Sequence, residues 1–430
     1  MDREIVYIFD MDGKKGIGKI YDKVVFVDNG IYGEKALVDV YEDKNSYFLG
    51  EKIDQIKKSP YEVDSRCPYF PKCGGCSYQN INYELEKKLK KDQIINQLKR
   101  IGKIDIEDIE FIGNDENQYG YRNKISLKVD ENGYLSLYDS SYNLINIKNC
   151  NITSKDINDL ISEIQKVLIN NSIKGFSRDN LDGIKGITIR DLGDIMLIIE
   201  FNRRPKDINK YMDLFASINV QSLYFSYNKK SYGYGRIDYI SGKEQLTYNI
   251  LNKTFKVSPK SFFQVNKYMT EKIYKKAIEY LKFVKGKNVL DLYCGTGTIS
   301  ILISDYVNKV IGIEDVKQAV SDGINNLELN NVKNVSFINE KVENYLYKLV
   351  NKNIDTIIVD PPRRGLDRKS LRQIINSDIN NFIYISCNPA TFSRDIKSLS
   401  KGGYVLKDVC GFDNFSKTNN MECVGLLVRE

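Results

Sequence analysis

The stretch VLDLYCGTGTIS, residues 289–300, decides the fold of the C-terminal half of the chain. A hydrophobic strand runs into Gly295-Thr296-Gly297, and an apolar segment of helical character follows. Glycines let the backbone turn tightly and approach a ligand closely, and the free amides of a helix N-terminus attract polar groups. Although a Gly-x-Gly sequence alone is a weak signal, this strand, turn and helix together indicate a ligand pocket.

Strands and helices alternate on both sides of this stretch. The predicted strands are KNVLDLYCG, NKVIGIEDV, NVSFINE, IDTIIVDPP and FIYISCNP. Strands at such intervals predict an α/β fold, a doubly wound Rossmann-like parallel sheet over residues 253–430, with ligands at the carboxyl ends of the strands.

Two acidic residues follow strands of this predicted sheet. Glu314 lies about 20 residues after the glycine turn, where a carboxylate can accept both hydroxyls of a ribose. The last glycine of the dinucleotide fingerprint is missing, which favours a nucleoside ligand over NAD. In DPPRRG, residues 360–365, two prolines make a rigid exit from the sheet and hold Asp360 at the pocket. The alternative is that the glycines only form turns and Glu314 is a surface acid, but the ordered set favours the pocket.

The chain has 430 residues, which predicts about three domains at ~150 residues each. Residues 1–58 alternate apolar and polar positions between Gly- and Asn-containing turns, which predicts a small OB-like β-barrel. Residues 59–252 hold a cysteine-rich loop, an amphipathic helix at about 84–101 and mixed strands, which predicts an α+β central domain. Residues 253–430 form the Rossmann-like domain.

The composition limits both location and chemistry. There are 64 Lys and Arg against 57 Asp and Glu, a net charge of +7 that favours a polyanionic partner without proving one. No stretch approaches ~18 apolar residues and the start lacks signal-peptide features, so we expect a cytoplasmic protein without membrane association. The chain contains no histidine, which excludes a His base, a His-paired cysteine and a His-ligated metal.

Half of the eight cysteines form a set. Cys67, Cys73 and Cys76 lie within ten residues, and Cys150 comes much later. In a cytoplasmic chain this indicates a metal ion or cluster rather than disulfides, since four thiolates can hold either. Zinc sites usually show two Cys-x-x-Cys pairs, and only Cys73 and Cys76 form one, which weakens zinc.

LDLYCGTGTIS, DPPRRG and SCNPATFSRD, in this order and spacing, resemble the RNA 5-methyluridine methyltransferases of the RumA/TrmA family. The likeness continues upstream through SPKSFFQVN and YGYRNK to the cysteine loop and the barrel. It implies S-adenosylmethionine as cofactor, a TRAM domain that binds RNA at the N-terminus, and docking of the helix at 84–101 on the catalytic domain. The positions that match the cofactor site are Gln264, Tyr293, Gly295, Gly297, Thr298, Glu314 and Asp360.

The chemistry of uracil explains why a thiol belongs at this site. Uracil C5 is a poor nucleophile, so a thiolate must first add to C6 and make C5 enolate-like before it can take a methyl group. Cys387 follows the fifth strand, where both substrates should meet, and is the predicted nucleophile. A thiol with a pKa near 8.5 is mostly protonated at neutral pH, so we expect a cation such as Arg394 beside it. The alternative is a buried structural cysteine.

The reaction also needs a base for the C5 proton. Glu422 matches the family glutamate that has this role, and its alternative is a solvated acid at a strand edge. The family usually has histidine two residues before this glutamate, whereas this chain has Asn420. Cys294 matches the family's structural cysteine, and we expect Cys410 and Cys423 to be core or edge residues.

The resemblance also bears on the metal and the substrate. It implies a [4Fe-4S] cluster on Cys67, Cys73, Cys76 and Cys150, with zinc as the weaker alternative. Family members with both a TRAM domain and these cysteines look like ribosomal RNA enzymes, so we expect a monomer that acts on 23S ribosomal RNA, with transfer RNA as the alternative. Amino-group methyltransferases have an aromatic residue after the Pro-Pro pair, where this chain has Arg363. A rival from another class is a non-catalytic RNA-binding or ribosome-assembly protein with a vestigial pocket.

Overall fold

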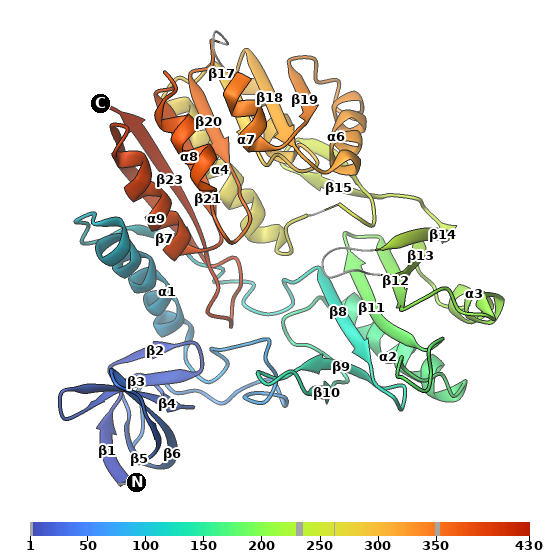
Figure 1. Ribbon diagram of the computed structural model, residues 1–430. Helices are drawn as coiled ribbons and strands as arrows, with labels where there is room; N and C mark the ends of the chain where they lie inside the picture. The colour runs from blue at the N-terminus through green and yellow to red at the C-terminus, as the bar shows by residue number, and fades with distance from the viewer. Residues whose placement is uncertain (1–2, 229–234, 262, 349–352) are drawn as a thin grey trace.

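The computed structural model of the protein describes residues 3–228, 235–261, 263–348 and 353–430. Sheets of six, seven and eight strands and a two-stranded hairpin organise these residues. Figure 1 shows the three large sheets as separate bodies, with the first at the lower left, the second at the lower right and the third at the top. Phe262, within the SPKSFFQVN motif, lies outside the described residues.

The first sheet confirms the predicted β-rich N-terminal domain. Its strand order is β1-β5-β6-β4-β3-β2. Alternate residues point inward as the sequence pattern predicts, so that Val25, Val27, Ala36 and Val38 are fully buried in a small core. The strands are β1 (Arg3–Tyr7), β2 (Asp10–Asp12), β3 (Lys15–Ile20), β4 (Lys23–Asp28), β5 (Lys35–Asp43) and β6 (Tyr47–Lys57).

The second sheet has the order β10-β9-β8-β11-β12-β13-β14 and is antiparallel except for the β12/β13 pair. Apolar side chains of α2 and α3 pack with its strands in one core, which makes this part α+β. The elements are β8 (Lys124–Val129), β9 (Leu135–Tyr138), β10 (Leu144–Asn146), α2 (Lys155–Asn170), β11 (Ile184–Asp191), β12 (Ile195–Phe201), α3 (Ile208–Ala216), β13 (Ser222–Tyr227) and β14 (Arg236–Gly242).

One segment from the middle of the sequence belongs in space to the third sheet. It comprises α1 (Tyr83–Gln97), a short π-helix (Leu98–Gly102) and β7 (Glu110–Ile112). β7 pairs in parallel with β22 and forms the edge of the third sheet. Ile94, Ile95 and Leu98 are buried in the same core as the third sheet. The helix therefore lies against the catalytic domain, as Figure 1 shows at the left.

The third sheet has the order β19-β18-β17-β20-β21-β23-β22-β7 and confirms the predicted α/β fold. Strands β17 to β21 are parallel, and β23 is antiparallel to β21. The chain moves outward from β17 to β19 and then returns to β20 on the other side of β17. This reversal creates a crevice at the carboxyl ends of β17 and β20, where ligands of such sheets bind.

The remaining elements are β15 (Leu246–Ile250), β16 (Lys253–Val257), α4 (Lys267–Phe283), β17 (Asn288–Leu292), α5 (Thr298–Ile303), a 3-10 turn (Ser304–Tyr306), β18 (Lys309–Glu314), α6 (Lys317–Leu329), β19 (Val335–Asn339), α7 (Val342–Tyr345), a 3-10 turn (Leu346–Lys348), β20 (Thr356–Val359), α8 (Arg368–Ile375), β21 (Asn381–Ser386), α9 (Pro389–Ser400), β22 (Tyr404–Phe412) and β23 (Glu422–Arg429). No helix within the described ranges is long and apolar enough to cross a bilayer.

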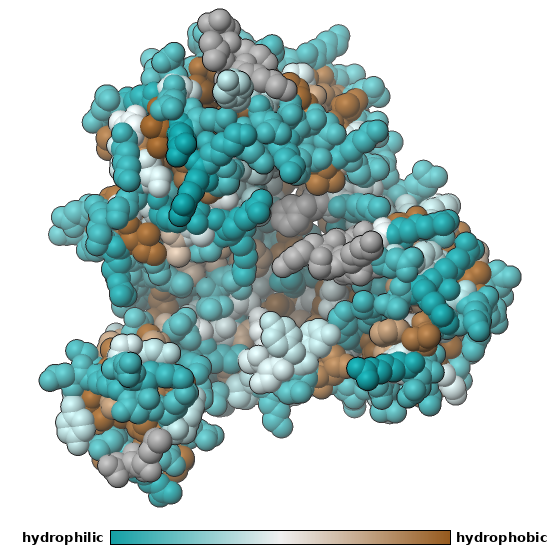
Figure 2. All heavy atoms as spheres, viewed as in Figure 1, coloured by the Kyte–Doolittle hydropathy of each residue, from teal (hydrophilic) through white to brown (hydrophobic). Residues whose placement is uncertain are grey.

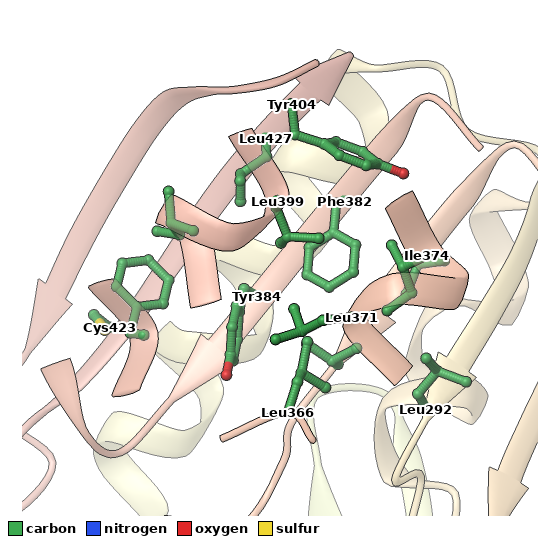
Figure 3. Packing of buried hydrophobic residues seen from close by; sticks show 14 of the residues in the cluster. Leu292, Leu366, Leu371, Ile374, Phe382, Tyr384, Leu399, Tyr404, Cys423 and Leu427 are labelled. Carbon is green, nitrogen blue, oxygen red and sulfur yellow. The ribbon is translucent and has the colours of Figure 1, made fainter. Parts of the chain in front are cut away.

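A close-packed core holds the strands that carry the site (Figure 3). The ring of Tyr384 on β21 meets Phe392 of α9 edge-on at 5.2 Å between centroids, and its hydroxyl donates to Asp395 at 2.8 Å. Cys423 is fully buried in this core, and Cys410 is fully buried on the other face of the sheet. Because protein cores are close-packed, the ends of β21 and β23 are held in fixed positions.

Candidate active site

A cavity of about 1350 Å³ opens at the carboxyl ends of β17, β18, β20 and β21. This is more than the roughly 300–1,000 Å³ of a site for one small ligand, so two ligands can lie in it together. Phe415, from the loop between β22 and β23, forms part of its wall. The sequence-predicted residues that line the cavity are Gln264, Tyr293, Gly295, Thr298, Glu314, Asp360, Cys387 and Glu422.

The glycine turn between β17 and α5 forms one wall of the cavity. Tyr293, Gly295 and Gly297 have φ values of 62°, 56° and 76°, in the left-handed region that makes the tight turn. A Cβ added at Gly295 would meet no atom within 4 Å, so the space above it is open to a ligand. A Cβ at Gly297 would lie 2.1 Å from Phe337 Cζ. Gly297 therefore makes room for Phe337, and it does not line the cavity.

Glu314 is attached to this turn by hydrogen bonds. Its Oε2 accepts from the Gly295 amide at 3.0 Å, and its Oε1 accepts from the Val316 amide at 2.9 Å. Burial raises the pKa of Glu314, and these two amides act in the opposite direction. The carboxylate is thus oriented at the end of β18 beside the cavity, where it can accept hydroxyl groups of a ligand.

Two carboxyl groups, those of Asp360 and Glu422, also line the cavity. Asp360 follows β20, and burial raises its pKa to about 7. Glu422 begins β23 and is only 3% exposed, so it is not a solvated strand-edge acid. Burial, and then the nearby charge of Asp360, raise the pKa of Glu422 well above its usual value. Since two like charges in a buried site oppose each other, the ionised form of either carboxyl group disfavours ionisation of the other.

Cys387 lies between β21 and α9 and is half-buried. Burial raises its pKa to about 11, and the carboxyl groups of Glu422 and Asp360 add to this effect. Arg363 acts in the opposite direction, both by its charge and by a hydrogen bond to the sulfur. The thiol is therefore protonated at rest, and Arg363 is the cation that favours its anion.

The expected cation, Arg394, is wrong for this role. Arg394 lines the cavity, but its guanidinium lies 2.7 Å from Asp395 Oδ1. It also donates to the carbonyl oxygens of Arg364 and Leu366 at 2.9 and 3.2 Å. Its charge is paired with Asp395 of α9, and its donors also bind the chain that follows β20.

Two asparagines, Asn414 and Asn420, make hydrogen bonds to site residues that the sequence did not predict. The Asn414 side chain hydrogen-bonds Glu422 and donates to Gln264 Oε1 at 3.5 Å, and its carbonyl accepts from Asn266 at 3.0 Å. Asn420 accepts a hydrogen bond from Arg363. Both asparagines lie in the polar loop before β23, where a sequence offers no signal that separates a site residue from an ordinary turn residue.

A basic rim surrounds the mouth of the cavity. Its cations are exposed and come from the loop after β20, the start of α8 and the residue before α7. Such a concentration of positive charge attracts polyanions. Figure 2 shows the hydrophilic surface of this face and a hollow between the catalytic domain above and the two lower domains. The rim consists of Lys341, Arg363, Arg364, Arg368 and Lys369.

The four predicted metal ligands are not among the residues that line the cavity, and they lie near one another without the close grouping of a metal site. The pKa of Cys76 is raised to about 12 by burial, with additions from Cys150, Cys73 and Cys67. Cys150 likewise has its pKa raised by burial, Cys73 and Cys67. Mutual effects of this kind place the four sulfur atoms in one neighbourhood, and an all-thiol set suits a soft metal or an iron-sulfur cluster. In the described part of the chain no group of three or more His, Cys, Asp or Glu side chains is close enough to hold a metal ion as it stands.

Comparisons with known proteins agree with this geometry. A family model described as tRNA (uracil-5-)-methyltransferase matches residues 82–430. A protein of Caldanaerobacter subterraneus described as an uncharacterized RNA methyltransferase is 34% identical and is aligned over 98% of each chain. A protein of Clostridium acetobutylicum with the same description is 33% identical, over 99% of this chain and 96% of the relative.

Among solved structures, the Pyrococcus abyssi tRNA (uracil-54, C5)-methyltransferase in complex with S-adenosyl-L-homocysteine has a TM-score of 0.80. It is 24% identical and matches 99% of this chain and 100% of its own, a likeness that shows the fold. The predicted enzyme class, an RNA (uracil-5-)-methyltransferase, is confirmed by the family model and the relatives. The chain belongs to the tRNA (uracil-5-)-methyltransferase family.

Proposed function

We propose that this protein transfers a methyl group from S-adenosylmethionine to C5 of a uridine in RNA, with Cys387 as nucleophile and Glu422 as base. One observation carries the proposal: a single cavity is lined by the residues predicted for the cofactor, among them Gly295, Glu314 and Asp360, and by the predicted catalytic pair, Cys387 and Glu422. A methyl donor and a uracil ring can therefore meet inside this cavity.

The cofactor half of the cavity is formed by the turn after β17. The open space above Gly295 admits a ligand, Glu314 is oriented to accept ribose hydroxyls, and Tyr293 offers an aromatic face. Gln264 and Asp360 line the same cavity, and Thr298 begins α5 beside it. Family membership and the product-bound Pyrococcus abyssi structure support S-adenosylmethionine as the ligand. When bound, it supplies an electrophilic methyl group.

The protein residues then act in a fixed order. Cys387 loses its thiol proton to solvent, and Arg363 stabilises the resulting thiolate. The sulfur adds to C6 of uracil, and the electron pair of the C5–C6 bond makes C5 nucleophilic towards the methyl group. Glu422 takes the C5 proton, the C5–C6 double bond forms again, and the sulfur leaves as thiolate. A raised pKa makes the ionised Glu422 carboxylate a stronger proton acceptor than an exposed one.

Trapping with 5-fluorouridine RNA tests this order. Fluorine at C5 cannot leave as a proton does, so the intact enzyme with its cofactor should remain covalently attached to the RNA. Cys387→Ala should form no such complex, and denaturing electrophoresis separates the two outcomes. Full methylation by Cys387→Ala, or no complex with the intact enzyme, would refute the assignment of the nucleophile.

The substrate is proposed to be large-subunit ribosomal RNA. The β-rich N-terminal domain and the group of four cysteines support it, since the resemblance links that combination to ribosomal RNA enzymes. The Pyrococcus abyssi neighbour is named for transfer RNA, which keeps transfer RNA as the second candidate. Comparing 5-methyluridine in both RNA classes from cells with and without this protein decides between them.

The group of four cysteines is proposed to hold a [4Fe-4S] cluster that organises the loop at residues 67–76. Its all-thiol donor set and the shared neighbourhood of Cys67, Cys73, Cys76 and Cys150 support this assignment. Iron and acid-labile sulfide measured in protein purified without oxygen test it. Stoichiometric zinc without sulfide would instead favour a single metal ion.

A further inference from the structure

The loop at residues 413–421, between β22 and β23, is a meeting point for segments from all parts of the chain. Figure 1 shows it extending from the catalytic domain down towards α1 and the N-terminal domain. The Ser77 side chain donates to Asn419 at 3.5 Å, and Gly13 of the N-terminal domain lies beside the same asparagine. This loop leads directly into Glu422, the proposed base.

A fully buried charge network fastens α1 to this loop. Lys90 Nζ lies 2.8 Å from Glu86 Oε1 and 2.5 Å from Asp413 Oδ1, and all three side chains are 0% exposed. Lys417, within the loop, lies 3.1 Å from the other oxygen of Glu86. The two carboxylates, Glu86 and Asp413, thus balance the charges of the two lysines. Buried ions of this kind are retained only where each has a partner, because an unpaired one is poorly tolerated.

The backbone carbonyl groups of residues 415–417 in the loop accept hydrogen bonds from other parts of the chain. Lys90 donates to the carbonyl of Phe415 at 3.1 Å, and Tyr121 donates to that of Ser416 at 2.9 Å. The amides of Ser77 and Tyr78, directly after the cysteine loop, donate to the carbonyl of Lys417 at 2.8 and 3.0 Å.

The backbone conformation of Lys417 indicates that contacts with other segments of the chain hold the loop in its shape. Its φ is 68°, a left-handed conformation that is uncommon for a residue with a long side chain. Such a conformation persists where the surrounding contacts over-determine it. The bonds from α1, the cysteine loop and the central domain supply those contacts.

The same loop carries the groups that surround the reacting atoms. Asn414 hydrogen-bonds Glu422, Phe415 forms part of the cavity wall, and Asn420 holds Arg363 beside the thiol. A shift of the loop would therefore displace Glu422 first, because Glu422 follows the loop directly, whereas the glycine turn and Glu314 are held by their own hydrogen bond.

We propose that α1 and the segment after the cysteine loop control proton removal at C5, by holding the loop 413–421 through Lys90 and its partners. Lys90, Tyr83 and Asp413 are positioning residues, since they act through the loop and touch no substrate. This inference rests on the proposed function of Glu422.

The order of the reaction makes the effect measurable. Thiol addition and methyl transfer come before the step that needs Glu422, so a displaced base leaves the methylated RNA attached to Cys387. A misplacement of about 1 Å can cost ~10²-fold in rate. A loosened loop should therefore slow turnover and cause a covalent adduct to accumulate on ordinary uridine RNA, where the intact enzyme shows almost none.

The test compares two lysines of the same helix. Lys90→Met removes the central buried charge, and Lys88→Met removes a charge that pairs with Asp92 on the exposed face of α1. Full-length variants are assayed for turnover, for adduct with ordinary RNA on denaturing gels, and for affinity towards S-adenosylhomocysteine. We expect Lys90→Met to turn over tenfold to hundredfold more slowly, to accumulate the adduct and to bind S-adenosylhomocysteine within about twofold of the intact enzyme. Lys88→Met should resemble the intact enzyme in all three.

A milder variant covers the case in which Lys90→Met does not fold. Tyr83→Phe removes only the hydroxyl that donates to Asp413 at 2.6 Å, leaves every charge paired, and should give the same adduct to a smaller extent. Three results would overturn the inference. A folded Lys90→Met protein could show normal turnover, or it could turn over slowly without forming the adduct. If Lys90→Met does not fold, a Tyr83→Phe protein free of adduct would have the same consequence. If the intact enzyme forms neither 5-methyluridine nor a fluorouridine complex, the proposed function itself fails.

Discussion

Removing the charge of Arg363 should move the pH dependence of adduct formation to higher pH. In the proposed reaction the thiolate of Cys387 is the reactive form, and the thiol pKa of about 11 already includes the favourable effect of Arg363. An opposite charge at close range lowers a pKa by ~1–3 units, and the exposure of Arg363 places its effect near the lower end. Arg363→Met should therefore raise the thiol pKa by about one unit, which is tenfold less thiolate at any pH well below it.

The assay is the single-turnover rate of covalent complex formation with 5-fluorouridine RNA, measured against pH at saturating RNA and cofactor. Arg363→Met should be about tenfold slower near neutral pH and approach the intact enzyme as pH rises, because the thiol then ionises without help. Arg363→Lys should recover part of the loss. Arg364→Met is the matched control, since Arg364 lies on the same exposed rim. We expect it to weaken RNA binding without moving the profile, and equal profiles for the intact enzyme and Arg363→Met would refute this reasoning.

Three further predictions follow from the site and its supports. Glu422→Gln should slow release of methylated RNA by ~10²–10⁴-fold while adduct formation continues; fast release, measured by rapid quench, would remove Glu422 from the base role. Gly297→Ala places a methyl group against Phe337 and should lower the free energy of unfolding by ~1–3 kcal/mol, seen as a lower midpoint in denaturant; an unchanged midpoint would contradict the packing role of this glycine. Cys150→Ser should lose most iron and sulfide but keep S-adenosylhomocysteine affinity, because the four cysteines are not among the residues that line the cavity; retained iron would exclude Cys150 as a ligand.

The residues at the carboxyl edge of the sheet could be placed from the sequence. Glu314 ends a strand of the parallel sheet, and Asp360 and Cys387 each come shortly after one. Parallel topology brings such positions to one edge of the sheet, whatever the conformation of the loops. Glu422 could not be placed this way, because β23 is antiparallel and its start reaches the same edge only through the long loop before it. Its assignment depended on the family resemblance.

Two predicted roles depend on what a residue touches. Gly297 makes room for Phe337 of β19, and its role towards the cofactor stays a prediction. Arg394 was assigned to the thiol and instead pairs with Asp395, while Arg363 acts on the sulfur. The sequence shows that a glycine or a cation is present, but the packing of neighbouring elements decides which space the glycine leaves free and where the cation points.

The sequence by itself determined the α/β sheet, the β-rich N-terminal domain and which predicted site groups come to one edge of the sheet, because hydrophobic periodicity and turn chemistry act over a few neighbouring residues. Only the tertiary structure decided the state of those groups and their supports. Lys90 and Asp413 are 323 positions apart in the chain yet share a buried ion pair. The pKa of Cys387 likewise depends on burial, on Asp360 and Arg363 from the loop after β20, and on Glu422 at the start of β23. Such through-space electrostatics exist only after the elements have packed, since solvent separates and screens the same charges in the unfolded chain.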